Sequence, residues 1–303
     1  MPTADRFMLA SYIETQSDIQ NIIRLFDSLN EFGGGFKGTP ISIYYPDHAS
    51  IDSDSLKKLD GIGIESTACA VPAQARKLFY AGKVYAAGEA EAEAERRKSV
   101  LIWMDEDTII LSEPDDFSFA PDIKLAYVPV MHNRSGSLYG APPDDFWGRI
   151  YTLLGLTDDM LFPMVTPADQ QTIRAYFHCG LAVVRPQCGI LRRWVKDFEK
   201  LCRDEALAEM CASDRTKNVF LHQTALTGAV LNSINRDEMR QLPESYNYPV
   251  FFEKQYGAVR PFDSIENVVT LRCVVSSENM GEDWPTRLKG PQDKIDWLKE
   301  RIR

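Results

Sequence analysis

The chain has 303 residues, of which 44% are hydrophobic and 26% are charged, as in soluble globular proteins with enough material for a sizeable core. Its 34 Lys and Arg residues against 44 Asp and Glu residues give a net charge of -10, which argues against a nucleic-acid partner. No apolar run approaches the ~20 residues that span a bilayer, and the first residues lack a secretory pattern, so we expect no integral membrane segment. Six scattered cysteines without a CxxC pair indicate reduced thiols and a cytoplasmic protein.

The first third of the chain alternates expected strands with expected helices. The strands are expected at 7–13, 41–45, 61–65 and 100–104, and the helices at 18–32, 53–59 and 72–98. The glycine run at 33–35 follows a helix, so it is a poor candidate for a phosphate-binding loop. This alternation predicts an α/β sheet with parallel central strands.

The later chain continues with the same two kinds of element. Strands are expected at 124–131, 180–184 and 268–275, and helices at 144–154, 190–204, 221–234 and 292–302. A polar loop is expected at 132–143. Because no repeat or low-complexity linker divides the chain, we expect one compact domain.

Three consecutive acidic residues, Asp105, Glu106 and Asp107, stand between two apolar runs in SVLIWMDEDTIILSEP, residues 99–114. Carboxylates cost several kcal/mol when they are desolvated without partners, so a bound cation is the most economical explanation. Mg²⁺ and Mn²⁺ prefer such oxygen ligands. If extended geometry persists, Asp105 and Asp107 share one face and Glu106 points elsewhere. The alternative is an acidic turn that holds no ion.

This acidic segment and several others resemble the GT-A glycosyltransferases, in the expected order over roughly 7–247. The matching segments are Gly82-Lys83-Val84-Tyr85-Ala86, the D-x-D element Asp105-Glu106-Asp107-Thr108, residues 175–186 (AYFHCGLAVVRP), residues 221–226 (LHQTAL) and Leu242-Pro243-x-x-Tyr246-Asn247. Val128-x-x-Met131-His132-Asn133 followed by Asp145-Phe146-Trp147 looks closest to a bacterial branch of GT-A-like proteins.

The resemblance implies a fold and an activity. The fold would be α/β, a single GT-A-like (Rossmann-like) domain over 1–303 with a mixed, mostly parallel central sheet flanked by helices. Residues 1–118 would form the nucleotide-binding half and 119–303 the sugar and acceptor half. The activity would be hexosyltransferase-like: metal-dependent transfer of a sugar from a nucleotide-diphosphate-sugar donor, first of all a UDP-sugar, to an unidentified acceptor. The cofactor would be Mn²⁺ or Mg²⁺.

The resemblance also suggests site residues, each with a structural alternative. Asp107 would bind the metal directly, and Asp105 would bind it through water or contact the ribose. Ser11, Tyr12 and Glu14 follow the first strand, where open α/β sheets bind ligands. Tyr12 would stack on the nucleobase or else pack under the loop. Lys83 would contact phosphate or else be a surface lysine.

The remaining candidates belong to the sugar and acceptor half. The proposed sugar contacts are His132, Asn133, Cys179 and Gly180, and the proposed catalytic residues are Gln223, Asp145 and His178. His132, Asn133 and Asp145 would otherwise cap a loop, and His178 would otherwise be a core histidine. Cys179 would otherwise be a small residue beside Gly180. For Gln223 the competing explanation is a hydrogen bond at the start of a helix.

Two departures from the family pattern keep other functions open. His222 stands where an aspartate is usual, and no His-x-x-Gly-x-Lys-Pro-Trp segment supplies a third metal ligand, for which Glu278 is the available oxygen donor. A non-catalytic nucleotide-binding or scaffold protein is therefore one alternative. A phosphohydrolase is another, although its Asp-x-Asp motif needs a Thr four positions after the first Asp and Thr108 lies three after Asp105.

Overall fold

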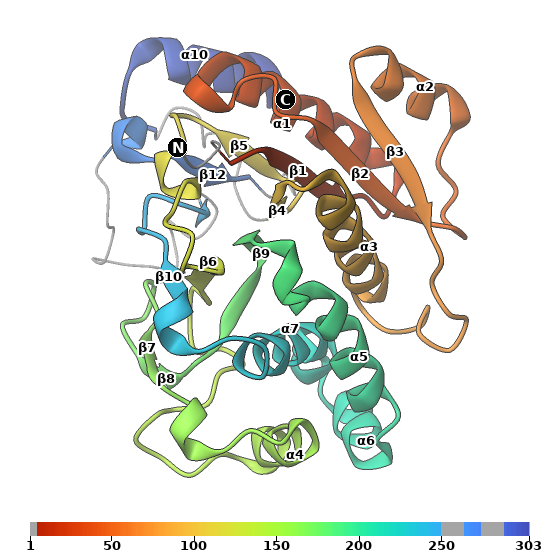
Figure 1. The fold of residues 1–303 in the computed structure, drawn as a ribbon, viewed down its shortest axis with the longest axis vertical. Coiled ribbons are helices and arrows are strands. Elements are labelled where there is room, and N and C mark those ends of the chain that lie inside the picture. Colours follow the sequence, from red (N-terminus) through yellow and green to blue (C-terminus); the bar gives the residue numbers. More distant parts are fainter. Residues whose placement is uncertain (1–4, 250–263, 274–287, 303) are drawn as a thin grey trace.

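The computed structural model describes residues 5–249, 264–273 and 288–302, and its centre is a seven-stranded sheet (Figure 1). The order of its strands is β10 (Met239–Gln241), β6 (Leu125–Pro129), β9 (Phe177–Val184), β4 (Val100–Met104), β1 (Phe7–Tyr12), β2 (Ile41–Pro46) and β3 (Ile64–Cys69). Strands β4, β1, β2 and β3 run parallel, β10 runs parallel to β6, and β9 is antiparallel to both of its neighbours. The expected mixed, mostly parallel sheet is confirmed.

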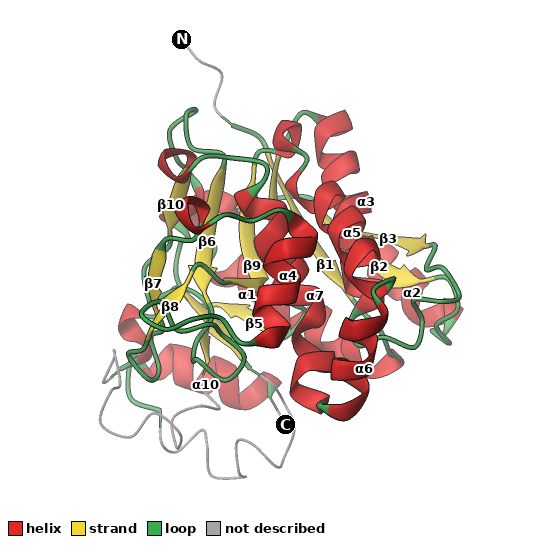
Figure 2. Cartoon of the chain, turned by 90° about the horizontal axis from the view of Figure 1, so that it is seen from below, coloured by secondary structure: helices red, strands yellow, loops and turns green. Residues whose placement is uncertain are grey.

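Helices cover both faces of this sheet. They are α1 (Ile19–Phe32), α2 (Ser53–Gly61), α3 (Ala81–Arg97), α4 (Asp145–Leu154), α5 (Ile190–Cys202), α6 (Glu205–Ser213), α7 (Arg215–Leu231) and α10 (Gln292–Arg301). Figure 2 shows α3, α4, α5 and α7 in front of the sheet and α1 behind it. Strand β1 explains this layering, because its alternate side chains pack on opposite faces: Met8 and Ala10 join the core beneath α3, and Leu9 joins the core beneath α1.

Two smaller sheets complete the described strands. One contains β11 (Tyr248–Pro249), β12 (Thr270–Arg272) and β5 (Thr108–Ile110), and the other pairs β7 (Pro163–Val165) with β8 (Thr172–Arg174). Strand β12 is antiparallel to β5, with Arg272 opposite Thr108. This pairing carries a late segment of the chain to the acidic turn that follows β4.

Several element boundaries differ from the sequence prediction. The helix expected at 72–98 begins only at Ala81, because Tyr80 adopts left-handed backbone angles with φ 59°. The strand expected at 61–65 is β3, at Ile64–Cys69. The helix α6 was not predicted; it begins because the Asp204 carboxylate accepts the Leu207 N–H at 3.0 Å and starts a new helix. The strand expected at 268–275 is seen as β12, and its last two residues lie outside the described ranges.

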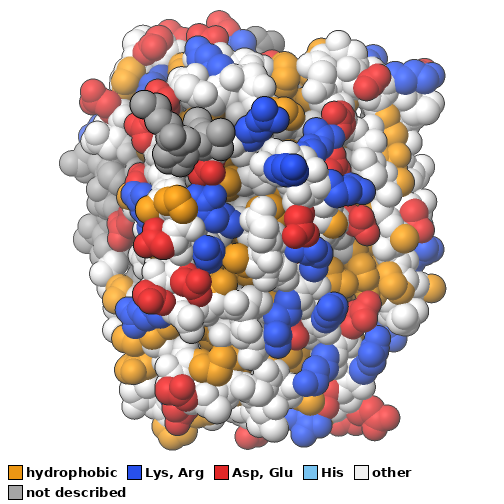
Figure 3. Space-filling view, viewed as in Figure 1, with side chains coloured by type: hydrophobic (Ala, Val, Ile, Leu, Met, Phe, Trp, Pro, Cys, Tyr) orange, Lys and Arg blue, Asp and Glu red, His pale blue; other side chains and the backbone are white. Residues whose placement is uncertain are grey.

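The visible surface carries charged side chains of both signs. Lys and Arg side chains are interspersed with Asp and Glu side chains across the face of the described chain seen in Figure 3. None of the helices in the described ranges is both long and apolar enough to cross a lipid bilayer. All six cysteines are free thiols.

Candidate active site

The acidic residues lie in a tight turn between β4 and β5. The Thr108 N–H donates to the Asp105 carbonyl at 3.1 Å, so the backbone turns here, and the extended geometry that would place Asp105 and Asp107 on one face does not persist. Asp105 and Asp107 are nevertheless both buried, at 5% and 8% exposure. The expectation of desolvated carboxylates at a strand end is confirmed.

Two side chains of the protein neutralise these carboxylates. Lys83, in the first turn of α3, forms a buried ion pair with Asp105. Arg272, at the end of β12, approaches Asp105 Oδ2 with Nη2 at 3.0 Å and both Asp107 oxygens with Nε at 3.2 Å. A bound ion was expected beside the acidic turn, but in this structure the neighbouring positive charges are those of Lys83 and Arg272.

The charges in this cluster shift one another's protonation. Burial opposes ionisation of Asp105, but Lys83 and Arg272 outweigh burial and hold the pKa of Asp105 at about 2. Burial raises the pKa of Asp107, and Arg272 opposes that rise. Burial and the charge of Asp107 raise the pKa of Glu106 to about 8. Burial would lower the pKa of Arg272, but the two aspartates raise it above its ordinary value, so the guanidinium stays charged.

His178 on β9 lies beside Arg272. Its Nε2 is 3.0 Å from Arg272 Nη1, and its Nδ1 accepts the Gly180 N–H at 2.9 Å. Burial, followed by the charge of Arg272, lowers the pKa of His178 well below its ordinary value, so the ring is neutral at pH 7. Gly180 must be glycine here, because a Cβ would overlap Asp105 Oδ2 and lie 2.7 Å from His178 Cε1.

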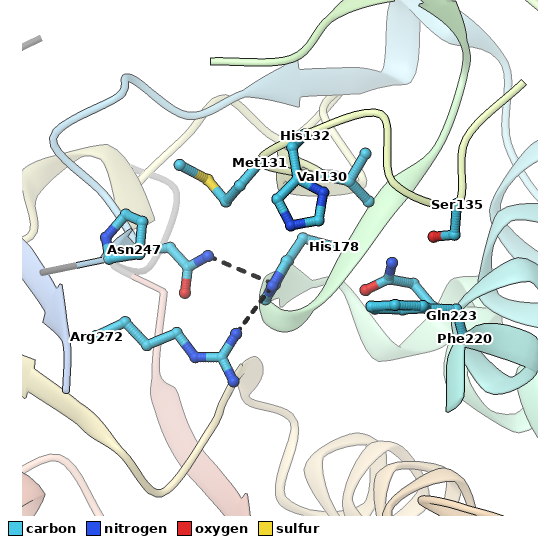
Figure 4. Close-up of a pocket in the computed structure, with 10 residues that line it drawn as sticks. Val130, Met131, His132, Ser135, His178, Phe220, Gln223, Asn247 and Arg272 are labelled. Carbon is cyan, nitrogen blue, oxygen red and sulfur yellow. Dashed lines mark hydrogen bonds between the residues drawn. The ribbon is translucent and has the colours of Figure 1, made fainter. Parts of the chain in front are cut away.

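Two adjoining cavities open on this cluster. A polar cavity of about 390 Å³ is lined by the whole acidic turn, Lys83 and Arg272, together with residues from the ends of β1 and α3 such as Tyr12 and Tyr80. A smaller, more apolar pocket of about 200 Å³ is lined by Val130, Met131, His132, Ser135, Asn247 and Pro249 (Figure 4). Four residues line both cavities and form the boundary between them: His178, Phe220, Gln223 and Arg272.

Residues 18–234 match the family model described as the Rhodobacterales glycosyltransferase domain. The match covers more than half of the chain. The chain belongs to this glycosyltransferase family. No curated protein matches it.

Solved structures of similar fold are also glycosyltransferases. The galactosyltransferase LgtC, solved with donor and acceptor sugar analogues, has a TM-score of 0.50 and 10% identity over 97% of this chain and 95% of its own. GlyE of Streptococcus pneumoniae TIGR4 has a TM-score of 0.50 and 11% identity over 98% of this chain and 61% of its own. The bifunctional glycosyltransferase WbbM has a TM-score of 0.52 and 10% identity; the match covers 100% of this chain and about half, 53%, of WbbM. The fold is of the GT-A type.

The glycosyltransferase domain brings together most of the predicted site residues. Those that line one or both cavities are Tyr12, Glu14, Lys83, Asp105, Asp107, His132, His178, Cys179 and Gln223. Gln223 Oε1 accepts the Cys179 N–H at 3.3 Å, so the amide links α7 to β9 at the cavity boundary. Gly180 lies directly beneath, in contact distance of Asp105.

Three predicted residues lie elsewhere. Asp145 is exposed at the start of α4 and lines neither cavity, so its position does not support a catalytic role. Ser11 is fully buried within β1 and lines neither cavity. Asn133 also lines neither cavity, and its backbone N–H donates to the carboxylate of Asp169, in the turn between β7 and β8, at 2.9 Å, which agrees with the loop-capping alternative.

Sequence reasoning missed two important polar residues. Arg272 sits four residues past Val268 in a strand that was recognised, but only its pairing with β5 brings it to the acidic turn. Asn247 belongs to a segment already noted for its resemblance; it adopts φ 56°, and its amide nitrogen is 3.4 Å from His178 Nδ1. The Asn247 Oδ1 atom is buried with no hydrogen-bond partner among the described residues, and the side chain lines the apolar pocket.

The described residues do not fit a divalent metal as they stand. Both expected ligands, Asp105 and Asp107, are paired with side-chain cations. Across the described ranges, no group of three or more His, Cys, Asp or Glu side chains is arranged to hold a metal ion. The candidate third ligand Glu278 lies outside the described residues. Two cations beside two aspartates already balance their charge, so a further dication would meet repulsion from Lys83 and Arg272.

Proposed function

We propose that this chain transfers a sugar from a nucleotide-diphosphate-sugar donor, with a UDP-sugar as the expected donor, to an acceptor that is still unidentified. The observation that carries the proposal is the pair of adjoining cavities, one polar and one apolar, that share His178, Gln223 and Arg272. A transferase needs such an arrangement, because the transferred group must reach from one substrate site into the other. LgtC, of similar fold, was solved with both donor and acceptor sugar analogues.

The polar cavity suits the nucleotide diphosphate. It lies at the carboxyl ends of β1 and β4, the edge at which open α/β sheets bind ligands. Its volume of about 390 Å³ is in the range of small-molecule sites. Tyr12 and Tyr80 offer ring surfaces for a nucleobase, and Lys83 offers a positive charge for phosphate.

The smaller pocket suits the sugar and the incoming acceptor. Val130, Met131 and Phe220 supply apolar surface for a sugar ring. Asn247 Oδ1, which has no hydrogen-bond partner among the described residues, supplies an acceptor for a sugar hydroxyl. Such a combination of apolar walls and a few polar groups orients a ligand within a pocket.

In the transfer, the bond between the anomeric carbon and the diphosphate oxygen breaks, and both electrons leave on the diphosphate. The acceptor oxygen forms the new bond to the anomeric carbon, and its proton passes to the departing diphosphate or to water. Positive side chains fixed beside the departing diphosphate stabilise the charge that develops there. His178 is held neutral and is a weak base, so we assign it to orienting the sugar, together with Gln223.

The family resemblance predicts Mn²⁺ or Mg²⁺, which would supply charge neutralisation at the diphosphate when bound. The described side chains around Asp105 and Asp107 do not fit the ion, because both aspartates are paired with Lys83 or Arg272, and no step of the proposed transfer passes through it. The metal and a cytoplasmic setting both stay predictions.

The proposal is tested by incubating the full chain with a panel of UDP- and GDP-sugars and measuring release of the nucleoside diphosphate. We expect release from at least one donor, and we expect Gln223→Ala to lower it by about 10-fold or more while UDP binding persists. Gln20→Ala is the control, because Gln20 is an exposed residue of α1. Nucleotide binding without turnover, with any acceptor offered, would favour the scaffold alternative. Neither binding nor turnover would overturn the proposal.

A further inference from the structure

The charged cluster already contains the positive charge that a diphosphate needs. Lys83 and Arg272 contact Asp105 from different elements, α3 and β12, and both line the polar cavity. The side chain of Arg272 remains 23% exposed, whereas Asp107 is 8% exposed. Arg272 is therefore the most exposed side chain of the four that form these ion pairs.

The guanidinium keeps hydrogens for that ligand. An arginine has five N–H groups on three nitrogens, in a fork that fits phosphate as well as carboxylate. The contacts of Nε with Asp107 and of Nη2 with Asp105 use one N–H on each of these nitrogens. Each of the two terminal nitrogens carries two hydrogens, so donors remain for a phosphate oxygen without breaking either aspartate contact.

The position of His178 leaves an N–H of Arg272 Nη1 available for a ligand. A neutral imidazole has one acceptor nitrogen, but both ring nitrogens of His178 face donors: the Gly180 N–H at 2.9 Å and Arg272 Nη1 at 3.0 Å. Only one of these donors can be satisfied. While the ring accepts from the Gly180 N–H, it cannot also accept from Arg272 Nη1. A phosphate oxygen in the polar cavity would be the acceptor for Nη1.

The start of α3 also attracts a phosphate group to the polar cavity. The helix begins at Ala81, and Tyr80, just before it, and Lys83, in its first turn, both line the polar cavity. Unpaired N–H groups at the start of a helix attract anions. Gly82 lets this turn approach β1 closely, because a Cβ there would overlap the Tyr12 hydroxyl.

We infer that the Arg272 guanidinium, with the Lys83 ammonium, holds the donor's diphosphate in the place where the family resemblance puts a divalent ion, and that nucleotide binding needs no metal. Asp105 and Asp107 then position the two cations and do not ligate an ion. The inference rests on the proposed function, because it assumes a nucleotide-diphosphate donor. It removes the metal from the site and gives Arg272 the principal role.

The first experiment measures the affinity of the full chain for UDP and GDP by calorimetry, once with EDTA and once with Mn²⁺. We expect one of the two nucleotides to bind with affinities that agree within about twofold in the two conditions, a difference small beside the loss of one charged contact. Electron paramagnetic resonance of Mn²⁺ added alone should show no stoichiometric binding. Binding that appears only with Mn²⁺ would overturn the inference and leave the proposed function standing. No binding of either nucleotide in either condition would overturn both.

The second experiment separates a diphosphate contact from a merely structural role. In EDTA, Arg272→Ala should weaken binding of the nucleoside diphosphate by about 10- to 100-fold, the loss expected for charged hydrogen bonds. Binding of the matching monophosphate should weaken less, so the ratio of the two affinities should fall. The double variant Arg272→Ala/Asp107→Asn removes the carboxylate that the single change leaves unpaired, and it should show the same fall if the single variant folds poorly.

Arg240→Ala is the matched control, because Arg240 also pairs with an aspartate, Asp116, but its side chain is 41% exposed and lines neither cavity. Its affinity ratio should equal that of the unaltered protein. An unchanged ratio in both Arg272 variants would overturn the inference, because a diphosphate held by Arg272 must lose affinity with that side chain.

Discussion

The acidic turn and the outer surface of the helices contain the same kinds of ion pair in opposite environments. In the acidic turn, Lys83 and Arg272 hold Asp105 and Asp107, whose side chains are 6% and 8% exposed. On α2, Lys57 pairs with Asp54 one turn earlier, and these side chains are 76% and 74% exposed. Geometry alone would rate both as good ion pairs.

Burial is what makes the two regions different. Water solvates an exposed charge nearly as well as its partner does, so an exposed pair contributes little. A buried carboxylate that loses its partner has no water to replace it, and the whole cost of its desolvation appears. The acidic turn should therefore be sensitive to single substitutions, and the surface of α2 should tolerate them.

Arg272→Ala should give the largest loss of stability. It removes a partner from both Asp105 and Asp107 and leaves Asp107 with no other side-chain cation in contact among the described residues. We expect the free energy of unfolding to fall by about 3–5 kcal/mol, as is usual when one partner of a buried pair is removed. Urea unfolding followed by circular dichroism measures the change.

The double variant Arg272→Ala/Asp107→Asn is the internal control for this interpretation. It removes the orphaned charge together with the arginine, so it should recover a large part of the lost stability. The double variant could instead have a lower free energy of unfolding than Arg272→Ala. The loss of stability in Arg272→Ala would then not come from the unpaired buried charge of Asp107.

Gly180→Ala tests the packing of the same region. A Cβ at this position would overlap Asp105 Oδ2 and crowd His178, neither of which can move away without breaking its contacts. We expect a loss of about 1–3 kcal/mol, typical of overpacking, together with weaker nucleotide binding. Gly148→Ala in α4 is the matched control, because no atom outside its own helix lies within 4 Å of the added carbon. It should be neutral or slightly stabilising, and equal losses at both glycines would contradict the explanation.

The sheet could be predicted from the sequence because its signals are local. Buried strands such as β1 and β4 are short apolar runs, and α1 shows helical spacing from Ile19 onward. Boundaries were predicted less well where a single backbone angle or cap decides them. Tyr80 delays α3, and Asp204, at the end of one expected helix, begins the unpredicted helix α6.

The carboxylates of the site could also be predicted, but their partner could not. Three acidic residues between apolar runs predicted a bound metal ion, which stays a prediction, whereas the positive charge that the structure places beside them belongs to Lys83 and Arg272. Whether the cation is a metal or a side chain depends on which distant strand pairs with β5, and Arg272 lies 165 residues from Asp107 along the chain. Strand pairing at such separation has no signal in a single sequence, so Arg272 was not recognised.

His222 gives a smaller, pH-dependent effect. Burial lowers its pKa from 6.5 to about 3, so between these values the unfolded chain binds a proton that the folded chain does not. Stability contributed by the neutral ring is therefore lost as the pH falls below 6.5, by about 2 kcal/mol at about pH 5. His222→Gln should reduce the difference in unfolding free energy between pH 7 and pH 5 by that amount. An unchanged difference in His222→Gln would show that another group causes it.

Lys57→Ala should give the smallest effect and completes the comparison. With both of its charges in water, the Lys57–Asp54 pair should contribute too little for its loss to move the urea midpoint resolvably. Salt separates the two regions further: the Debye length falls from about 10 Å at 0.1 M to about 3 Å at 1 M, which screens exposed charges and leaves buried ones largely unaffected. Any difference between Lys57→Ala and the unaltered protein should therefore vanish at high salt, whereas the deficit of Arg272→Ala should persist. If high salt erased both, the charges at the acidic turn would be solvated in solution and their burial would not explain their stability.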